Sequence, residues 1–188
     1  MLTDYFRYIN FRQSSFPGFY VISFRKNSYY ACAYGSRFRG KMQITELMKS
    51  LRTFPKYRAT DFDFHHIVER PHLADISCSG ATVDESYSGM PSIMIHKGEH
   101  NRYNMILRAG ETRELYMRSG QNLPVGVAES ERKVREMLAD NKDSAKAEIG
   151  KRIEILKHIY QGVYEENDVL QIVSMNILND YRNRLSKL

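Results

Sequence analysis

The chain has few cysteines and no long apolar run, and each of these features excludes a class of protein. Two cysteines, Cys32 and Cys78, are too few among 188 residues for a disulfide scaffold or a thiolate zinc site. No apolar segment approaches the roughly 18 residues of a membrane-spanning helix. The first residues also lack the apolar core of a signal peptide. We therefore expect a globular protein of a reducing compartment, with no membrane insertion.

Acidic residues are scarce in the first third of the chain. Residues 1–60 contain eleven Lys or Arg but only two acidic residues, a balance of +9, whereas the whole chain carries a net charge of +6. The same segment holds 14 of the 22 aromatic residues. Cations interleaved with aromatic rings suit a polyanion, because the cations bind phosphates and the rings stack on bases. Alternatively, the aromatic residues form the core of a sheet and the basic residues lie on its solvated face. The positive charge favours an acidic partner under either interpretation.

The hydrophobic pattern indicates an α+β fold with three consecutive regions. Residues 1–57 form a basic, aromatic, β-rich region, and residues 58–105 form a core that carries most of the histidines. Residues 106–188 are mainly helical, and we expect this extension to pack on the same domain.

Individual elements follow from local patterns. Alternating aromatic and β-branched residues predict strands, apolar residues at helical spacing predict helices, and a Ser, Gly and Pro-rich stretch predicts a loop long enough to be functional. The expected strands are 19–25 and 28–34, joined as a hairpin at Lys26-Asn27, and 62–68; the expected helices are 45–51, one beginning at Ser130, 145–160 and 167–185; the expected loop is 69–90.

Four of the six histidines fall in two short segments. His65 and His66 lie near the end of a predicted strand, and His96 and His100 are four residues apart. On a helix, this spacing places both imidazoles on one face. Adjacent strand residues point to opposite faces, which favours one metal ligand and one base from the His-His pair. The pattern therefore predicts a divalent metal site, because neutral imidazoles bind metals and accept protons near pH 7.

These segments also carry a family resemblance. The stretch Phe-His-His-Ile-Val-Glu, followed by a loop and then by Pro-Ser-Ile-Met-Ile-His-x-x-Glu-His, resembles the HNH, or ββα-metal (His-Me finger), endonucleases. It is most similar to the His-His branch found in bacterial toxin nuclease domains and colicin-type DNases. The resemblance covers about residues 60–105 and implies a ββα-metal core. It implies that His65 is a metal ligand, that His66 is the general base, and that His96 and His100 are further ligands.

The resemblance implies a metal-dependent endonuclease, with DNA favoured over RNA as substrate. One divalent ion is expected, Mg²⁺, Mn²⁺, Zn²⁺ or Ni²⁺, and imidazole ligands favour the transition metals in affinity. Similarity to toxin domains implies an antibacterial effector with an acidic immunity protein that complements its basic surface. Such a protein is cytoplasmic in the producer and reaches target cells by a non-classical or contact-dependent route.

Three charged residues flank the histidines. Arg70 and Arg102 are candidates for phosphate binding, because the guanidinium fork matches phosphate oxygens. Glu69 is a candidate to orient an imidazole from behind. Alternatively, both arginines are solvent-exposed surface residues and the glutamate forms an ordinary salt bridge.

Two other functions compete with the nuclease. His96, Glu99 and His100 match the His-x-x-Glu-His pattern of inverted zinc peptidases, in which Glu99 would be the base. That interpretation leaves His65 and His66 unexplained. A non-catalytic module that binds nucleic acid or an acidic partner through the basic N-terminal region is the stronger alternative.

Overall fold

The fold is α+β, as the sequence predicts. The computed structural model describes residues 2–14, 18–33, 58–78, 89–108 and 126–188. Its strands are β1 Asn10–Gln13, β2 Tyr20–Phe24, β3 Asn27–Ala33, β4 Phe62–His66 and β5 Pro91–His96; its helices are the 3₁₀ helices η1 Leu2–Phe6 and η2 Ala59–Asp61, and α2 Arg70–Ala74, α4 Lys97–Arg108, α6 Val127–Asp140, α7 Lys142–Val163 and α8 Asp168–Ser186.

The strands form one antiparallel sheet in the order β1-β2-β3-β5-β4. The predicted hairpin is confirmed, although its turn is Arg25-Lys26, one residue earlier than expected, because Phe24 pairs with Asn27. Arg25 adopts a left-handed φ of 51°, which a two-residue hairpin turn requires. Strand β3 pairs with β5, so the N-terminal region and the histidine-bearing core share this sheet.

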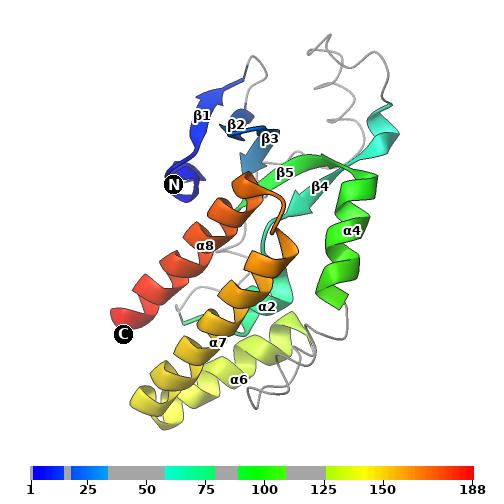
Figure 1. Cartoon of the computed structure of the whole chain (residues 1–188). Coiled ribbons are helices and arrows are strands. Elements are labelled where there is room, and N and C mark those ends of the chain that lie inside the picture. Colours follow the sequence, from blue (N-terminus) through cyan, green and yellow to red (C-terminus); the bar gives the residue numbers. More distant parts are fainter. Residues whose placement is uncertain (1, 15–17, 34–57, 79–88, 109–125) are drawn as a thin grey trace.

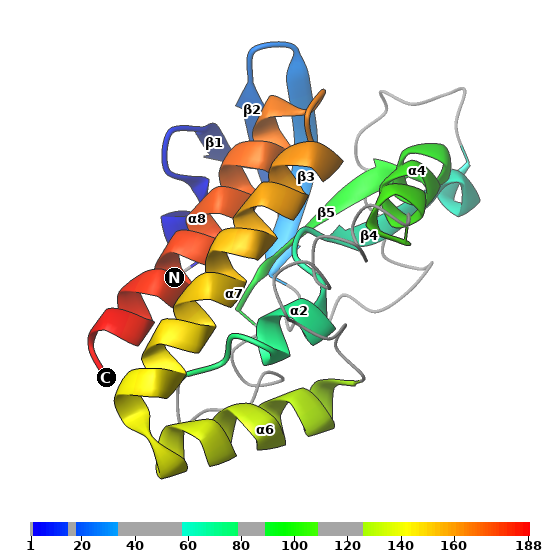
Figure 2. The ribbon, with the colours of Figure 1, turned by 60° about the horizontal axis from the view of Figure 1, so that its bottom comes forward.

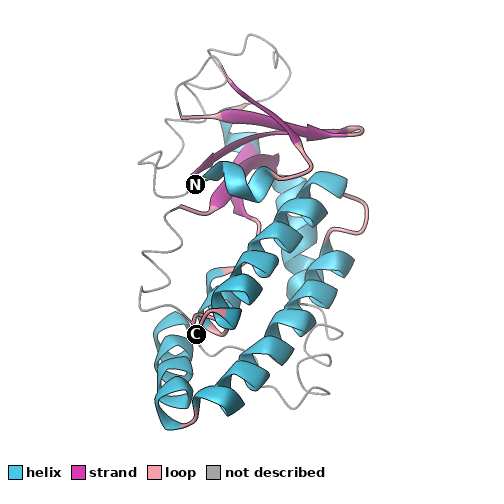
Figure 3. Ribbon diagram, turned by 90° about the vertical axis from the view of Figure 1, so that its left-hand side faces the viewer, coloured by secondary structure: helices cyan, strands magenta, loops and turns pink. Residues whose placement is uncertain are grey.

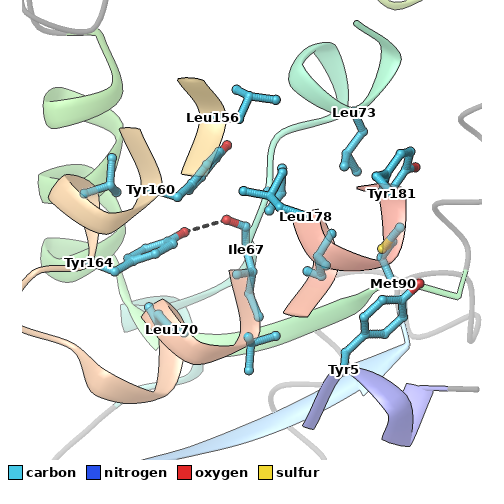
Figure 4. Packing of buried hydrophobic residues seen from close by; sticks show 14 of the residues in the cluster. Tyr5, Ile67, Leu73, Met90, Leu156, Tyr160, Tyr164, Leu170, Leu178 and Tyr181 are labelled. Atoms are coloured by element: carbon cyan, nitrogen blue, oxygen red, sulfur yellow. Dashed lines mark hydrogen bonds between the residues drawn. The ribbon is translucent and has the colours of Figure 1, made fainter. Parts of the chain in front are cut away.

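One face of the sheet is covered by helices. Ile22, Ala31 and Ile93 come from three adjacent strands, share this face by register, and have no exposed surface. Helix α8 packs against β2 and β3, and α7 lies beside α8 in the opposite direction (Figures 1 and 3). The core lies between this face and the two long helices, where the apolar side chains in Figure 4 gather.

The predicted helices of the last third are confirmed, although the first begins at Val127, three residues earlier than expected. Asn141 and Asn167 begin α7 and α8, and each side-chain oxygen accepts a hydrogen bond from a backbone N–H three residues later. Helix α6 packs across the far end of α7 (Figure 2). The apolar stripe of α8 is buried as expected: Val169, Leu170, Val173, Ile177, Leu178 and Tyr181.

The segment after β4 differs from the expected loop. It contains the short helix α2, which begins with Arg70-Pro71. Proline suits the first turn of a helix, where its missing N–H has no helical partner, so here it marks a helix start instead of a loop. Strand β4 ends at His66, two residues earlier than predicted. The predicted helix 45–51 lies outside the described residues.

None of the helices in the described ranges combines the length and the apolar character needed to cross a membrane.

Candidate functional site

Strands β4 and β5 and helix α4 form a ββα unit. The strands are antiparallel, with His65 opposite Ile93, and β5 leads directly into α4. Helix α4 packs back against both strands (Figures 1 and 2). Side chains alternate along a strand, so Asp63 and His65 share the face that α4 covers. The unit therefore sets a strand histidine beside a helix.

His65 and His100 meet inside this unit. Their ring centroids are 5.0 Å apart with 64° between the ring planes. His65 is only 2% exposed. Burial, and then the positive charges of His100 and His66, lower the pKa of His65 to about 3. At neutral pH its imidazole is therefore uncharged and keeps the lone pair that a metal ligand needs.

Asp63 orients His100 from the strand. Its Oδ2 atom lies 3.3 Å from Nδ1 of His100. A carboxylate accepts hydrogen bonds, so Nδ1 of His100 is the donor to Asp63, and in the neutral imidazole Nε2 then keeps the lone pair. This is the arrangement in which a carboxylate holds a metal-binding imidazole from behind.

Two tyrosines at the C-terminal end of α7 hold the chain just after β4. Tyr160 lies in the last turn of the helix and Tyr164 is its C-terminal cap. They are four positions apart, about one helical turn, and lie on the same side of the helix end. The hydroxyl of Tyr164 contacts Nε2 of His65 at 2.6 Å and donates to the carbonyl of Ile67 at 2.7 Å (Figure 4). The hydroxyl of Tyr160 accepts a hydrogen bond from the N–H of Glu69 at 2.9 Å. The C-terminal helical region thus fixes the segment that carries the strand histidine.

A pocket of about 280 Å³ opens at this point. Burial, and then the charges of Arg70 and His100, lower the pKa of His66 to about 4, so this imidazole is also neutral at neutral pH. The pocket brings together five of the predicted site residues and adds Asn104 from α4. The described residues that line it are His65, His66, Glu69, Arg70, Pro71, His100 and Asn104.

His96 lies on the other side of the sheet. The prediction that it shares a helix face with His100 is wrong, because β5 continues through His96 and α4 begins only at Lys97. His96 pairs with Phe62, and its ring meets the Phe62 ring edge-on at 5.9 Å. Its Nδ1 atom accepts the N–H of Gly98 at 3.1 Å, so the side chain closes the first turn of α4. The structure therefore does not bring His96 to the other predicted ligands.

Arg102 also lies apart from the pocket. It is an exposed residue of α4 and its guanidinium pairs with the carboxylate of Glu166 at 2.5 Å. The described residues that line the pocket include Arg70 but not Arg102. Of the two predicted phosphate-binding arginines, only Arg70 is positioned beside the histidines.

The donor set fits a metal ion with two protein ligands. Within the described residues, no group of three or more His, Cys, Asp or Glu side chains is arranged to hold an ion. His65 and His100 nevertheless converge, and each is held from behind by a hydrogen-bonding partner, Tyr164 and Asp63 respectively. Water and a substrate oxygen would complete the coordination of an ion held in this way.

Three residues of the site were not among those predicted. Asp63 is two positions before His65, so the strand period places it on the same face. Asn104 is four positions after His100, so the helical period places it on the same side of α4. Tyr164 has no such local signal, because it lies 99 residues after His65.

Comparisons with known proteins find no relative of this chain. No protein-family model matches it, and neither the curated proteins nor the solved structures contain a match.

Proposed function

We propose that this protein is a metal-dependent endonuclease that hydrolyses phosphodiester bonds of nucleic acid, with DNA favoured over RNA. One observation carries the proposal: a strand histidine and a helix histidine, His65 and His100, converge with ring centroids 5.0 Å apart. They do so in a ββα unit, at a pocket that also contains a third histidine and an arginine, His66 and Arg70.

His65 and His100 would hold the ion through one nitrogen each. When bound there, the metal would neutralise the scissile phosphate and stabilise the leaving oxygen. Two imidazole ligands favour Mn²⁺, Ni²⁺ or Zn²⁺ over Mg²⁺ in affinity, because Mg²⁺ prefers oxygen ligands. Asp63 supports this role, because its hydrogen bond to Nδ1 turns Nε2 of His100 outward.

His66 and Arg70 would act on the water and the phosphate. The neutral imidazole of His66 accepts a proton from the attacking water as the new P–O bond forms, and the bond from phosphorus to the leaving oxygen breaks. The leaving alkoxide takes a proton from solvent. The guanidinium of Arg70 binds the non-bridging phosphate oxygens, since its planar fork matches their geometry. Glu69 and Asn104 supply further polar groups at the same pocket.

The contacts of Glu99 argue against the zinc peptidase. Its Oε1 atom accepts hydrogen bonds from the hydroxyls of Tyr29 at 2.6 Å and Tyr103 at 2.7 Å, and from the amide of Asn167 at 3.1 Å. A carboxylate held by three donors is poorly placed to serve as a general base. The two histidines of that motif, His96 and His100, also lie on opposite sides of the sheet.

A nuclease assay with matched variants tests the proposal. The purified full chain is incubated with supercoiled plasmid DNA and with total RNA, each with Mg²⁺, Mn²⁺, Ni²⁺, Zn²⁺ or EDTA. We expect metal-dependent nicking of the plasmid that EDTA abolishes. His66→Ala should slow it by at least about 100-fold, the usual contribution of a general base. His158→Ala is the control, because His158 is an exposed histidine of α7 outside the pocket-lining set.

Failure of the assay has a clear consequence. Binding of nucleic acid without cleavage under every metal, by a chain shown to be folded, would overturn the nuclease and favour the non-catalytic binding module. Cleavage of RNA with the plasmid left intact would retain the chemistry and reverse the preferred substrate. The toxin role and the acidic immunity protein stay predictions, because no contact among the described residues bears on either.

A further inference from the structure

The hydroxyl of Tyr164 lies between the imidazole of His65 and the backbone carbonyl of Ile67. It is 2.6 Å from Nε2 of His65 and 2.7 Å from the carbonyl oxygen of Ile67. Tyr164 itself has no exposed surface. Its ring packs edge-on against Tyr103 at 4.9 Å and tilted against Tyr160 at 5.8 Å, so the hydroxyl is held in one place.

The hydroxyl of Tyr164 has a single hydrogen, and this fixes the direction of its hydrogen bonds to Ile67 and His65. A carbonyl oxygen has no proton to donate, and two oxygens 2.7 Å apart repel each other unless a proton lies between them. The single hydroxyl proton of Tyr164 therefore points at Ile67. The contact with His65 must then be one in which Tyr164 accepts, so Nε2 of His65 carries a hydrogen. A neutral imidazole has only one N–H, which leaves Nδ1 with the lone pair.

We propose that Tyr164 is a positioning residue that holds His65 as the Nε2–H tautomer and thereby assigns Nδ1 as the atom that binds the metal. The role of Nδ1 as a metal ligand rests on the proposed function, whereas the tautomer does not. The described residues that line the pocket include His65 but not Tyr164, so the Nε2 side of the ring is turned toward α7 and away from the pocket.

The two candidate ligands are then held in complementary ways. Asp63 binds Nδ1 of His100 and leaves Nε2, whereas Tyr164 binds Nε2 of His65 and leaves Nδ1. One orienting group comes from strand β4 and the other from the end of α7. This gives the C-terminal helical region a direct task at the site, because the proton on His65 is set from there.

Imidazole ¹⁵N NMR of the metal-free full chain tests the tautomer. The long-range ¹H–¹⁵N pattern of a histidine shows which ring nitrogen carries the hydrogen, and comparison with the spectrum of His65→Gln assigns the His65 signals. We expect the wild-type ring to be Nε2–H. In Tyr164→Phe, which keeps the ring and loses only the hydroxyl, we expect a mixture of the two tautomers. A thermal melt shows that each variant is folded.

Tyr160→Phe is the matched control. Tyr160 lies one turn earlier, and its hydroxyl contacts Nδ1 of His72 at 2.8 Å and the N–H of Glu69 at 2.9 Å. The variant therefore removes a hydroxyl that holds the same segment without bonding to His65. This variant should therefore change the signals of His72 and leave those of His65 unchanged. A wild-type His65 with its hydrogen on Nδ1 would overturn the inference without any variant, as would a Tyr164→Phe spectrum identical to the wild type.

Binding of Mn²⁺ or Ni²⁺, measured by calorimetry without nucleic acid, tests the metal role. We expect Tyr164→Phe to weaken binding by about 10- to 100-fold, as is usual for loss of a group that orients a ligand, and Tyr160→Phe to bind normally. Equal affinity in Tyr164→Phe and the wild type would overturn the assignment of Nδ1 as the metal ligand. If the wild type binds neither ion, the proposed function fails, while the tautomer measurement still decides the role of Tyr164.

Discussion

The carboxylate of Asp63 and the imidazole of His100 join strand β4 to helix α4 through a contact of 3.3 Å between Oδ2 and Nδ1. The two residues lie 37 positions apart in the chain, where α2 and β5 come between their elements. The contact fixes which nitrogen of His100 carries the proton, and it ties the helix to the strand beside His65. Loss of this carboxylate should therefore affect both the orientation and the basicity of the proposed metal ligand His100.

Asp63→Ala should weaken binding of Mn²⁺ or Ni²⁺ by about 10- to 100-fold. Asp63→Asn should have a smaller effect, because the amide oxygen can still accept the hydrogen bond from Nδ1 but lacks the charge. Calorimetry of each metal-free variant measures the affinity. The control is Glu166→Gln, which removes a carboxylate that pairs with the exposed side of α4. Equal affinities for Asp63→Ala and Glu166→Gln would show that Asp63 does not orient a ligand.

His96→Ala and His100→Ala should separate the two histidines that share the sequence motif. His100 lines the pocket, whereas His96 lies on the opposite side of the sheet and bonds to the N–H of Gly98. We expect His100→Ala to abolish plasmid nicking and His96→Ala to stay within about threefold of the wild type, since only a surface turn changes. The initial rate of nicking at saturating metal measures this. Equal loss in both variants would restore His96 as a ligand.

Stability should fall in mildly acidic solution because His72 is buried as a neutral ring. Burial lowers the pKa of His72 to about 4, below the value near 6.5 of an exposed histidine. The unfolded chain therefore takes up a proton first as the pH falls below about 6.5, and this favours unfolding. The contribution is fully present above that pH and is lost as the pH falls toward 4. Between pH 7.5 and pH 5 we expect the protonation of His72 alone to lower the free energy of unfolding by about 2 kcal/mol.

Urea unfolding at pH 7.5 and at pH 5 measures this loss. His72→Asn keeps an acceptor for the hydroxyl of Tyr160 but cannot take up a proton. The variant should be less stable at pH 7.5, because the ring volume is lost, but its stability should change less between the two values. A pH dependence as steep as that of the wild type would show that His72 does not contribute to it.

Local periodicity predicted most of the fold because most of its elements are fixed by nearby residues. The hairpin, β4 and the start of α8 at Asn167 all follow from patterns within a few positions. The two-residue period of a strand and the 3.6-residue period of a helix were enough to predict the faces on which His65 and His100 lie. His96 was placed wrongly because the boundary between β5 and α4 falls directly after it, and a single residue decides which side it takes.

The remaining contacts depend on packing between distant parts of the chain. Tyr164 reaches His65 over 99 residues, and Arg102 finds Glu166 over 64. No pattern within a short window encodes either pair. The sequence therefore predicted the candidate ligands His65 and His100 but not the group that orients His65, and it predicted two arginines at the site where the structure positions only Arg70.

The two asparagines that begin α7 and α8 offer a final test of how α4 is held. Asn141 is exposed, and its side chain accepts only the N–H of Ser144 among the described contacts. Asn167 is 3% exposed; it accepts the N–H of Leu170, and its amide also donates to Glu99, the residue immediately before His100.

Asn141→Ala should lower the free energy of unfolding by about 1 kcal/mol, the usual contribution of a helix N-cap. Asn167→Ala should lower the free energy of unfolding by about 3 kcal/mol, because it removes a cap and also leaves the half-buried carboxylate of Glu99 with one donor fewer. Urea unfolding at pH 7.5 measures both values. Equal losses would mean that the contact with Glu99 adds nothing to stability. A larger loss for Asn167→Ala, together with weaker metal binding in the folded variant, would show that α8 helps to fix His100 through its neighbour.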